Sequence, residues 1–456
     1  MMRLFNFNLS LSFKFYWTLV ILIMKKFFFY LFGALAITAC TNEDFTELTF
    51  SEECNTIYVD SFYVPYETAL KHALEAIDNV DATTTRAVSP ERRVANHYEY
   101  VANKMTRTAN DDVEVRFHVI NFEDNQGFAL VSADSRTTPV YVYSETGNID
   151  MDNAIKNGGF GDFMAAAEEY YVMETSWTET GKPLLPVDPT LPITPIPMDS
   201  IVMLPLEYLD GELYHVKTEN VSEANPGGIL IDAEWGQGWP YNYYCGSGNI
   251  GIDYYGERNA AGCGPIAAAQ VMSYYQYPSS YNGIVFEWNK ILSSVYYSDV
   301  YPEISDNAMA TALLINTVGV AANAVYGSST SVTIGDITNM FEEMGYDFIG
   351  DVPYSSSCII GSLNASHPVI IGALNERSKG HMWAIDAFTR ESERKTYYYQ
   401  TLPYDVYRRT DEKISMYVHC NWGWGYDKNI SPCWCLSFYE TLNADFCYDA
   451  RILYIM

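Results

Sequence analysis

The chain has 456 residues, of which 57 are acidic and only 27 are Lys or Arg, so its formal net charge is −30. Nucleic acids and anionic membrane surfaces are bound mainly through clustered Lys and Arg, so this charge excludes a protein that binds a phosphate backbone. Hydrophobic residues make up 48% and charged residues 18%, which excludes a disordered chain and predicts buried cores. The length allows about three domains.

The first residues resemble an export signal. Residues 27–39 form an apolar run that follows Lys25 and Lys26 and ends at Cys40. A membrane-spanning helix needs roughly 20 apolar residues, so this shorter run is typical of a signal peptide. The small residues before Cys40 resemble a bacterial lipobox, in which the cysteine is acylated; the alternative is a plain apolar anchor. We expect residues 1–40 to be a signal peptide with Cys40 as the lipidation site.

The signal also predicts a location. Met24 and the two lysines after it open a complete signal, so we expect translation to begin at Met24. The acidic stretch after Cys40 resembles the signals that send some lipoproteins to the outer surface. We therefore expect an exported bacterial lipoprotein, at the periplasmic side of the outer membrane or on the cell surface, anchored or released. Its only contact with the membrane would be the N-terminal lipid.

A Pro-rich segment divides the rest of the chain. Residues 177–200 carry six prolines at near-regular spacing, and such a segment favours polyproline II and cannot join the interior of a sheet. This seam predicts a tether at 41–85, an N-terminal domain at 86–176, a linker at 177–220 and a larger domain at 221–456.

The N-terminal domain has the pattern of a strand meander followed by a helix. Apolar stretches at 113–124, 127–134 and 139–147 are separated by turn residues and predict three strands. Apolar positions at helical spacing, among them Phe160 and Phe163, predict a helix after them. This domain contains no cysteine, so we expect the chemistry elsewhere.

A cysteine in the larger domain has the setting of a nucleophile. Gly262 and Gly264 flank Cys263, Pro265 fits a first helical turn, and residues 266–275 favour a helix. At a helix N-terminus, unpaired N–H groups and the positive end of the dipole favour thiolate over thiol. The alternative is a buried, inert cysteine.

A nucleophile needs a base, and His381 is the best candidate. An apolar strand at 368–374 runs into a polar turn and returns from His381 onward, which places the imidazole at the mouth of a hairpin. The alternative is an ordinary structural histidine. Farther along, Asn421 and Trp422 lie in a turn where they would orient the imidazole and shield it from water, unless this turn serves only aromatic packing. Upstream, the amide of Gln237 would complete an oxyanion hole.

Taken in order, these motifs resemble the streptopain-like cysteine peptidases, a papain-like clan of secreted bacterial enzymes. The resemblance covers nearly all of residues 230–430 and rests on W-G-Q-G-W-P-Y-N, A-G-C-G-P-I-A-A-A-Q-V-M, Y-Q-Y-P, V-G-V-A-A-N-A-V-Y-G, G-H-M-W-A-I-D and N-W-G-W-G. It implies that Cys263 is the nucleophile and His381 the general base. It also implies that Gln237 belongs to the oxyanion hole and that Asn421 and Trp422 orient and cover the histidine.

The resemblance further implies a zymogen. The N-terminal strands resemble the family's inhibitory prodomain, so the partners would be protein or peptide substrates and the chain's own prodomain. Processing sites would lie within the Pro-rich segment and the stretch that follows it, to about residue 232. The implied fold class is α+β: a small α+β prodomain, then a papain-like peptidase domain with Cys263 on a central helix facing a barrel-like antiparallel sheet. No cofactor is expected.

Two features depart from the family pattern. Gly264, Pro265, Ile266 and Ala267 follow the cysteine where the family usually has a small residue and Ala-Thr-Ala, and an insertion after N-W-G-W-G carries two further cysteines. Besides Cys40 and Cys263, the chain contains Cys54, Cys245, Cys358, Cys420, Cys433, Cys435 and Cys447, an odd number, so at least one stays free of intramolecular disulfides. His419 lies beside Cys420, but the spacing of these groups is poor for zinc, and we expect no metal.

Two other functions stay open at this stage. The same Cys-His pair would support an amidase or a transglutaminase, and an exported aromatic-rich chain would also suit a non-catalytic surface lipoprotein that binds host or glycan ligands. Our hypothesis is a cysteine endopeptidase made as a zymogen.

Overall fold

The computed structural model describes residues 62–83, 91–101, 115–156, 158–180, 213–247, 258–374, 380–401, 404–425, 432–437 and 450–455. All of them belong to one compact unit, Val59–Met456. The predicted signal peptide with Met24 and Cys40, and most of the Pro-rich segment, lie outside the described residues, as do Cys54 and Cys447.

The N-terminal domain is a four-stranded antiparallel meander with helices packed on it. Its elements are α2 (Tyr66–Thr83), β1 (Val94–Val101), β2 (Val115–Phe122), the 3-10 turn Glu123–Asn125, β3 (Phe128–Ser132), β4 (Val140–Ser144), α3 (Met151–Ala154) and α4 (Gly158–Thr180). The strands follow one another in space in the order β1-β2-β3-β4. The three predicted strands and the predicted helix are confirmed as β2, β3, β4 and α4.

Helix α2 lies in the segment 41–85 that the sequence suggested to be a tether. Ala69, Ala73 and Ile77 recur every fourth residue, and all three are buried in the core of the N-terminal domain. Just before the helix, the Val64 N–H donates to the Ala133 carbonyl at 2.9 Å. The N-terminal domain therefore begins well before residue 86, because α2 covers its sheet.

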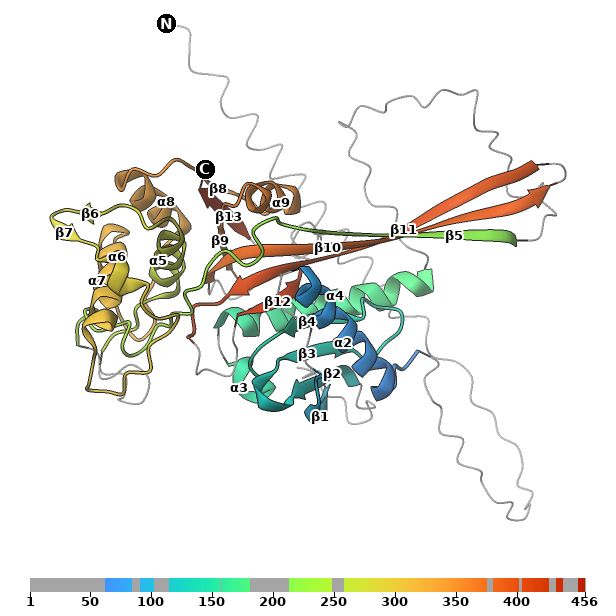
Figure 1. Ribbon diagram of the computed structural model, residues 1–456, viewed down its shortest axis with the longest axis horizontal. Helices are drawn as coiled ribbons and strands as arrows, with labels where there is room; N and C mark the ends of the chain where they lie inside the picture. The colour runs from blue at the N-terminus through green and yellow to red at the C-terminus, as the bar shows by residue number, and fades with distance from the viewer. Residues whose placement is uncertain are drawn as a thin grey trace, which may run out of the picture. The chain divides into compact units, whose positions relative to one another are not determined.

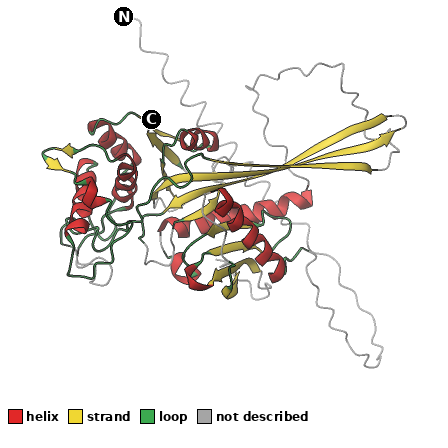
Figure 2. Ribbon diagram, in the orientation of Figure 1, coloured by secondary structure: helices red, strands yellow, loops and turns green. Residues whose placement is uncertain are grey.

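The C-terminal domain places helices against an antiparallel sheet (Figures 1 and 2). Its helices are α5 (Cys263–Tyr275), α6 (Trp288–Ile291), α7 (Asp306–Ala321), α8 (Ile334–Glu343) and α9 (Ser356–Asn364). Its strands are β5 (Leu213–Ala224), the short pair β6 (Ser280–Tyr281) and β7 (Ile284–Val285), β8 (Phe348–Pro353), β9 (Val369–Leu374), β10 (Gly380–Thr401), β11 (Tyr404–Asn421), β12 (Cys433–Leu436) and β13 (Arg451–Ile455). Helix α5 is central, because nearly all of its residues are buried.

Apart from the separate β6-β7 pair, the described strands of both domains form one antiparallel sheet, ordered β1-β2-β3-β4-β12-β11-β10-β9-β13-β8, with β5 paired on β10. The junction is β4 against β12, with Trp434 opposite Tyr143 and Cys435 opposite Val142. Figure 1 shows β10 and β11 running out as a long ribbon with β5 alongside. Strand β5 begins inside the expected linker 177–220, because it pairs along β10 from Leu213 onward. The expected α+β class is confirmed, whereas the sheet shared by both domains was not predicted.

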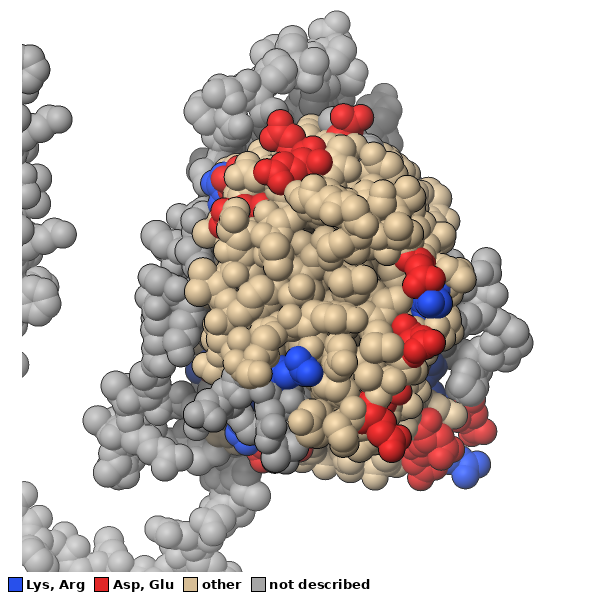
Figure 3. Space-filling model, turned by 90° about the vertical axis from the view of Figure 1, so that its left-hand side faces the viewer, with Lys and Arg blue, Asp and Glu red and all other residues tan. Residues whose placement is uncertain are grey.

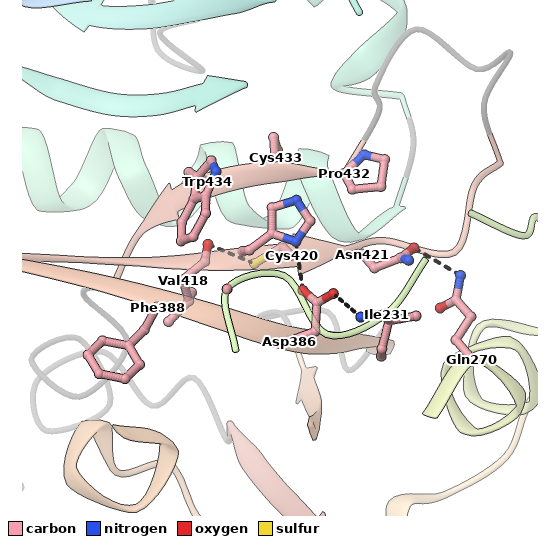
Figure 4. A network of polar contacts seen from close by, with 12 residues as sticks. Ile231, Gln270, Asp386, Phe388, Val418, Cys420, Asn421, Pro432, Cys433 and Trp434 are labelled. Carbon is pink, nitrogen blue, oxygen red and sulfur yellow. Dashed lines mark hydrogen bonds and ion pairs between the residues drawn. The ribbon is translucent and has the colours of Figure 1, made fainter. Parts of the chain in front are cut away.

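A buried ion pair joins β10 to β11. His419 Nδ1 lies 2.6 Å from Asp386 Oδ1, and the Ile231 N–H donates to the other carboxylate oxygen at 3.0 Å. Figure 4 shows the Asp386 carboxylate between β11, which carries His419, and Ile231. Burial acts to lower the pKa of His419, but the Asp386 carboxylate outweighs it and raises the pKa to about 9.

Replacing Asp386→Asn should therefore destabilise the protein in a pH-dependent way. The pair contributes fully below pH 6.5, the pKa of an unfolded histidine, and its contribution is lost as the pH rises through about 9. We expect the variant to lose about 3 kcal/mol of unfolding free energy at pH 6 and much less at pH 10. Urea unfolding at both pH values measures this, and an equal loss at both would contradict it.

Charge is unevenly spread over the surface. Figure 3 shows the side that bears α6, α7, β6 and β7, where charged side chains are few and Asp and Glu lie mainly toward the edges. Exposed apolar residues of these elements and their connections include Val285, Val300 and Val320. In the part of the chain that the structure describes, no helix combines the length and apolar character needed to cross a bilayer.

Candidate functional site

Cys263 is the first residue of α5, as the sequence predicted. The residue before it, Gly262, has a φ of 93°, a conformation that glycine adopts without steric cost. A Cβ there would also lie only 2.8 Å from Thr330 Cγ2. The glycine thus lets the chain turn sharply into α5, and the Cys263 thiol lies at the positive end of the helix.

His381 is the second residue of β10 and is held between aromatic rings. Its ring stacks on Trp424 with centroids 5.6 Å apart and an interplanar angle of 4°, and on Trp383 at 5.9 Å and 19°. Its Nε2 lies 2.9 Å from the Trp422 carbonyl. Because a carbonyl can only accept, Nε2 carries a proton and Nδ1 is left for the thiol.

Cys263 and His381 are in contact and shift each other's pKa. Burial acts to raise the pKa of the Cys263 thiol, but the charge of His381 and its hydrogen bond outweigh this and leave the pKa below its ordinary value. Burial acts to lower the pKa of His381, and the Cys263 thiolate reverses this shift, with smaller contributions from the Trp422 carbonyl and Asp162. Both directions favour a thiolate–imidazolium pair.

Removing the imidazole should therefore raise the pKa of Cys263. In a His381→Ala variant burial remains while the largest opposing influence is lost. We expect the rate of Cys263 alkylation by iodoacetamide, followed against pH, to rise only at higher pH than in the unmodified protein. An unchanged profile would mean that the two groups do not interact.

Gln237 lies beside the same helix. Its backbone carbonyl accepts from the Ala261 N–H at 2.9 Å, two residues before the thiol. A Cβ on the neighbouring Gly236 would come within 2.7 Å of the Trp424 carbonyl, so the Gln237 segment packs directly on the N-W-G-W-G turn. The structure thus brings together the motifs of Gln237, Cys263, His381 and Trp422.

Asn421 makes different contacts from those expected. Its side-chain oxygen accepts from Gln270 Nε2 at 2.9 Å, and its nitrogen donates to the Ala233 carbonyl at 2.7 Å. Figure 4 shows the Asn421 amide directed at Gln270 of α5. The hydrogen bond to the His381 ring comes instead from the next residue, through the Trp422 carbonyl.

Gln270 lies inside the cysteine motif, but its role was not predicted from the sequence. The sequence feature that could have indicated a role is a single amide side chain in a run of apolar helical residues, two turns after Cys263. It is fully buried and holds the segment before Gln237 through the Ala233 carbonyl at 3.2 Å, as well as Asn421. Gln270 is thus a positioning residue that ties the turn to α5.

Trp422 covers the histidine from one side. Its ring centroid lies 6.5 Å from that of His381, and its indole nitrogen donates to Cys433 Sγ at 3.3 Å. Cys433 and Cys435 are free thiols with their sulfur atoms 3.6 Å apart. The insertion after N-W-G-W-G therefore packs against Trp422 through Cys433.

The N-terminal domain reaches into this site through the first turn of α4. A Cβ on Gly159 would lie 2.1 Å from His381 Cδ2 and 2.7 Å from Nε2, so the helix backbone rests on the imidazole. Phe160 and Phe163 follow, each with its ring centroid 6.1 Å from that of Trp422. The sequence pattern predicted this helix but not its contact with the histidine.

Two protein-family models match the chain. Residues 235–429 match the model of the Peptidase C10 family, a range that contains Gln237, Cys263, His381, Asn421 and Trp422. The C-terminal domain is a C10 cysteine peptidase. Residues 61–171 match the Spi protease inhibitor family, so the C10 domain is preceded by its inhibitor, and the chain is a cysteine endopeptidase made as a zymogen. The match to the inhibitor family begins close to the start of α2, in agreement with the packing of that helix on the N-terminal domain.

Two solved structures are similar to the chain. A mutant fragment of Prevotella intermedia prointerpain A is 19% identical with a TM-score of 0.47, covering 78% of this chain and 98% of the fragment. Active wild-type interpain A cysteine protease from the same organism is 20% identical with a TM-score of 0.35, covering 49% of this chain and 92% of its own. No curated protein matches the chain.

Proposed function

We propose that Cys263 is the nucleophile and His381 the general base of this peptidase. The observation that carries the proposal is the contact between a thiol at the start of α5 and an imidazole fixed by Trp422 and Trp424, with mutually shifted pKa values. Gln237, fixed beside the thiol through Ala261, would supply one donor of an oxyanion hole and the Cys263 N–H the other.

The reaction then follows from these roles. The Cys263 thiolate attacks a peptide carbonyl, and the negative charge that develops on the oxygen is held by the two donors. The His381 imidazolium gives its proton to the leaving amine, which departs and leaves a thioester. The neutral imidazole next takes a proton from water, and the resulting hydroxide attacks the thioester and restores the thiol.

A labelling experiment tests these assignments. Purified full-length protein is incubated with and without an epoxide inhibitor of thiol peptidases, and peptides and new N-termini are mapped by mass spectrometry. We expect the label on Cys263 alone and self-processing only without inhibitor. Label on another cysteine, with processing still blocked, would assign the nucleophile elsewhere.

We also propose that the protein is exported as a lipoprotein, acylated at Cys40. The support is the sequence alone: an apolar run after two lysines, ending in small residues and a cysteine. The peptidase would then be held at the outer membrane by its lipid, on the periplasmic side or at the surface. In bacteria fed a labelled fatty acid, the protein should carry the label and the Cys40→Ala variant should not. Label retained by the variant would refute acylation at this position.

A further inference from the structure

Strand β12 is the edge of the peptidase part of the sheet and is covered by the prodomain. One side of β12 pairs with β11, and β4 occupies the other side. In the described part of the chain, no strand of the C-terminal domain lies on that second side. Removal of the prodomain would leave the N–H and C=O groups on the β4 side of β12 without partners among the described residues, and such an edge readily accepts another strand.

The side chains of β4 show what this edge recognises. The Tyr143 ring stacks on Trp434 with centroids 6.0 Å apart and an interplanar angle of 10°, and it meets Tyr417 edge-on at 5.2 Å. Two positions further on, Glu145 Oε2 accepts from Trp434 Nε1 at 3.1 Å. Trp434 thus contacts both the aromatic ring of Tyr143 and the carboxylate of Glu145.

Glu145 also lines a pocket of about 390 Å³. The C-terminal domain lines this pocket with the charged or ionisable groups Asp232, Glu234 and His419. His419 provides a cation there, shared with Asp386. Burial raises the pKa of Glu234, while the nearby His419 opposes this shift. Glu145 is among the groups that raise the pKa of His419, so an acidic side chain at this position is stabilised by His419 as well as by the Trp434 N–H.

The edge is also near the reacting groups. Cys433, the first residue of β12, pairs with Cys420 of β11, and the Trp422 indole donates to the Cys433 sulfur. A polypeptide lying on β12 therefore passes close to the residue whose carbonyl binds His381. One substrate chain can occupy both the β12 edge and the active site if a few residues connect the two bound segments.

We propose that the mature peptidase uses the β12 edge as an exosite, which binds an extended segment of its protein substrates by strand addition. The preferred segment has an aromatic residue where Tyr143 lies and an acidic residue two positions later. This inference rests on the proposed function, because the exosite opens only when the prodomain leaves. Strand addition takes affinity from main-chain hydrogen bonds and specificity from alternate side chains.

A binding experiment tests the exosite. The mature enzyme is prepared by self-processing of the full chain, and its thiol is blocked by the epoxide. The probe is a fluorescent peptide with the sequence of residues 138–147, followed by anisotropy. We expect binding, weakened about tenfold in peptides with Tyr143→Ala or Glu145→Gln. In the enzyme, Trp434→Phe should remove the preference for Glu over Gln, and Trp288→Phe, on α6, should retain it.

A kinetic experiment separates the exosite from the active site. One short peptide substrate is compared with the same substrate extended by residues 138–147. We expect the extension to lower KM about tenfold, and the free segment to compete only against the extended substrate. The exosite would be overturned if the free segment competed against both substrates or did not bind at all. It would equally be overturned if Trp434→Phe kept the preference for Glu over Gln, if the prodomain stayed bound after processing, or if β12 paired two copies of the enzyme into a dimer. No turnover of the short substrate would instead refute the proposed function.

Discussion

Cys263→Ala should lower peptidase activity by more than about 10⁴-fold and leave the full-length chain unprocessed. Without the sulfur there is no group at the start of α5 to attack the peptide carbonyl, and His381 has no proton to accept. The fold should survive, since the Cys263 side chain is only partly buried and loses one atom. Activity on a peptide substrate and the appearance of mature protein on a gel measure the effect.

Cys358→Ser is the matched control for this experiment. Cys358 is also a free, partly buried cysteine near a helix start, but it lies in α9 and its N–H is capped by Ser355. Its replacement should leave processing and activity close to normal. The Cys263→Ala protein should unfold at nearly the same temperature as the unmodified zymogen. A Cys263→Ala protein that still processes itself would end the proposed mechanism.

The local structure around Cys263 and around His381 could be predicted, because each motif contains residues that favour that structure. Gly262 and Pro265 place a helix start at Cys263 whatever surrounds it, and the polar turn before His381 places it at a strand end. Joining the two required the resemblance to a family, since no local rule brings together residues so far apart in the chain.

Contacts that depend on tertiary packing could not be predicted. Asn421 was expected to orient the imidazole, yet an amide side chain bonds whatever donors and acceptors surround it. Here its oxygen accepts from the buried Gln270 and its nitrogen donates to the Ala233 carbonyl. The pairing of β4 with β12 was equally hidden, because alternation along a strand shows which face is buried but not which strand lies beside it.

Gly159→Ala should release the inhibition of the zymogen and speed self-processing at least about tenfold. The new Cβ would lie 2.1 Å from His381 Cδ2, far inside contact distance. The imidazole cannot easily give way, because it is stacked on Trp424 and Trp383 and bonded to the Trp422 carbonyl. The first turn of α4 must therefore withdraw from the site. Activity of the freshly purified zymogen on a short peptide, and its processing rate, measure the change.

The direction of this effect distinguishes steric release from simple damage to the helix. Alanine favours a helix over glycine by about 1 kcal/mol, so Gly159→Ala should make α4 itself more stable while weakening its inhibition. Ala165→Ser, at an exposed position of the same helix, adds an atom away from His381 and should leave latency unchanged. The mature enzyme made from either variant should have normal activity, because α4 is no longer present. A Gly159→Ala zymogen as latent as the unmodified one would show that the contact with the imidazole does not maintain inhibition.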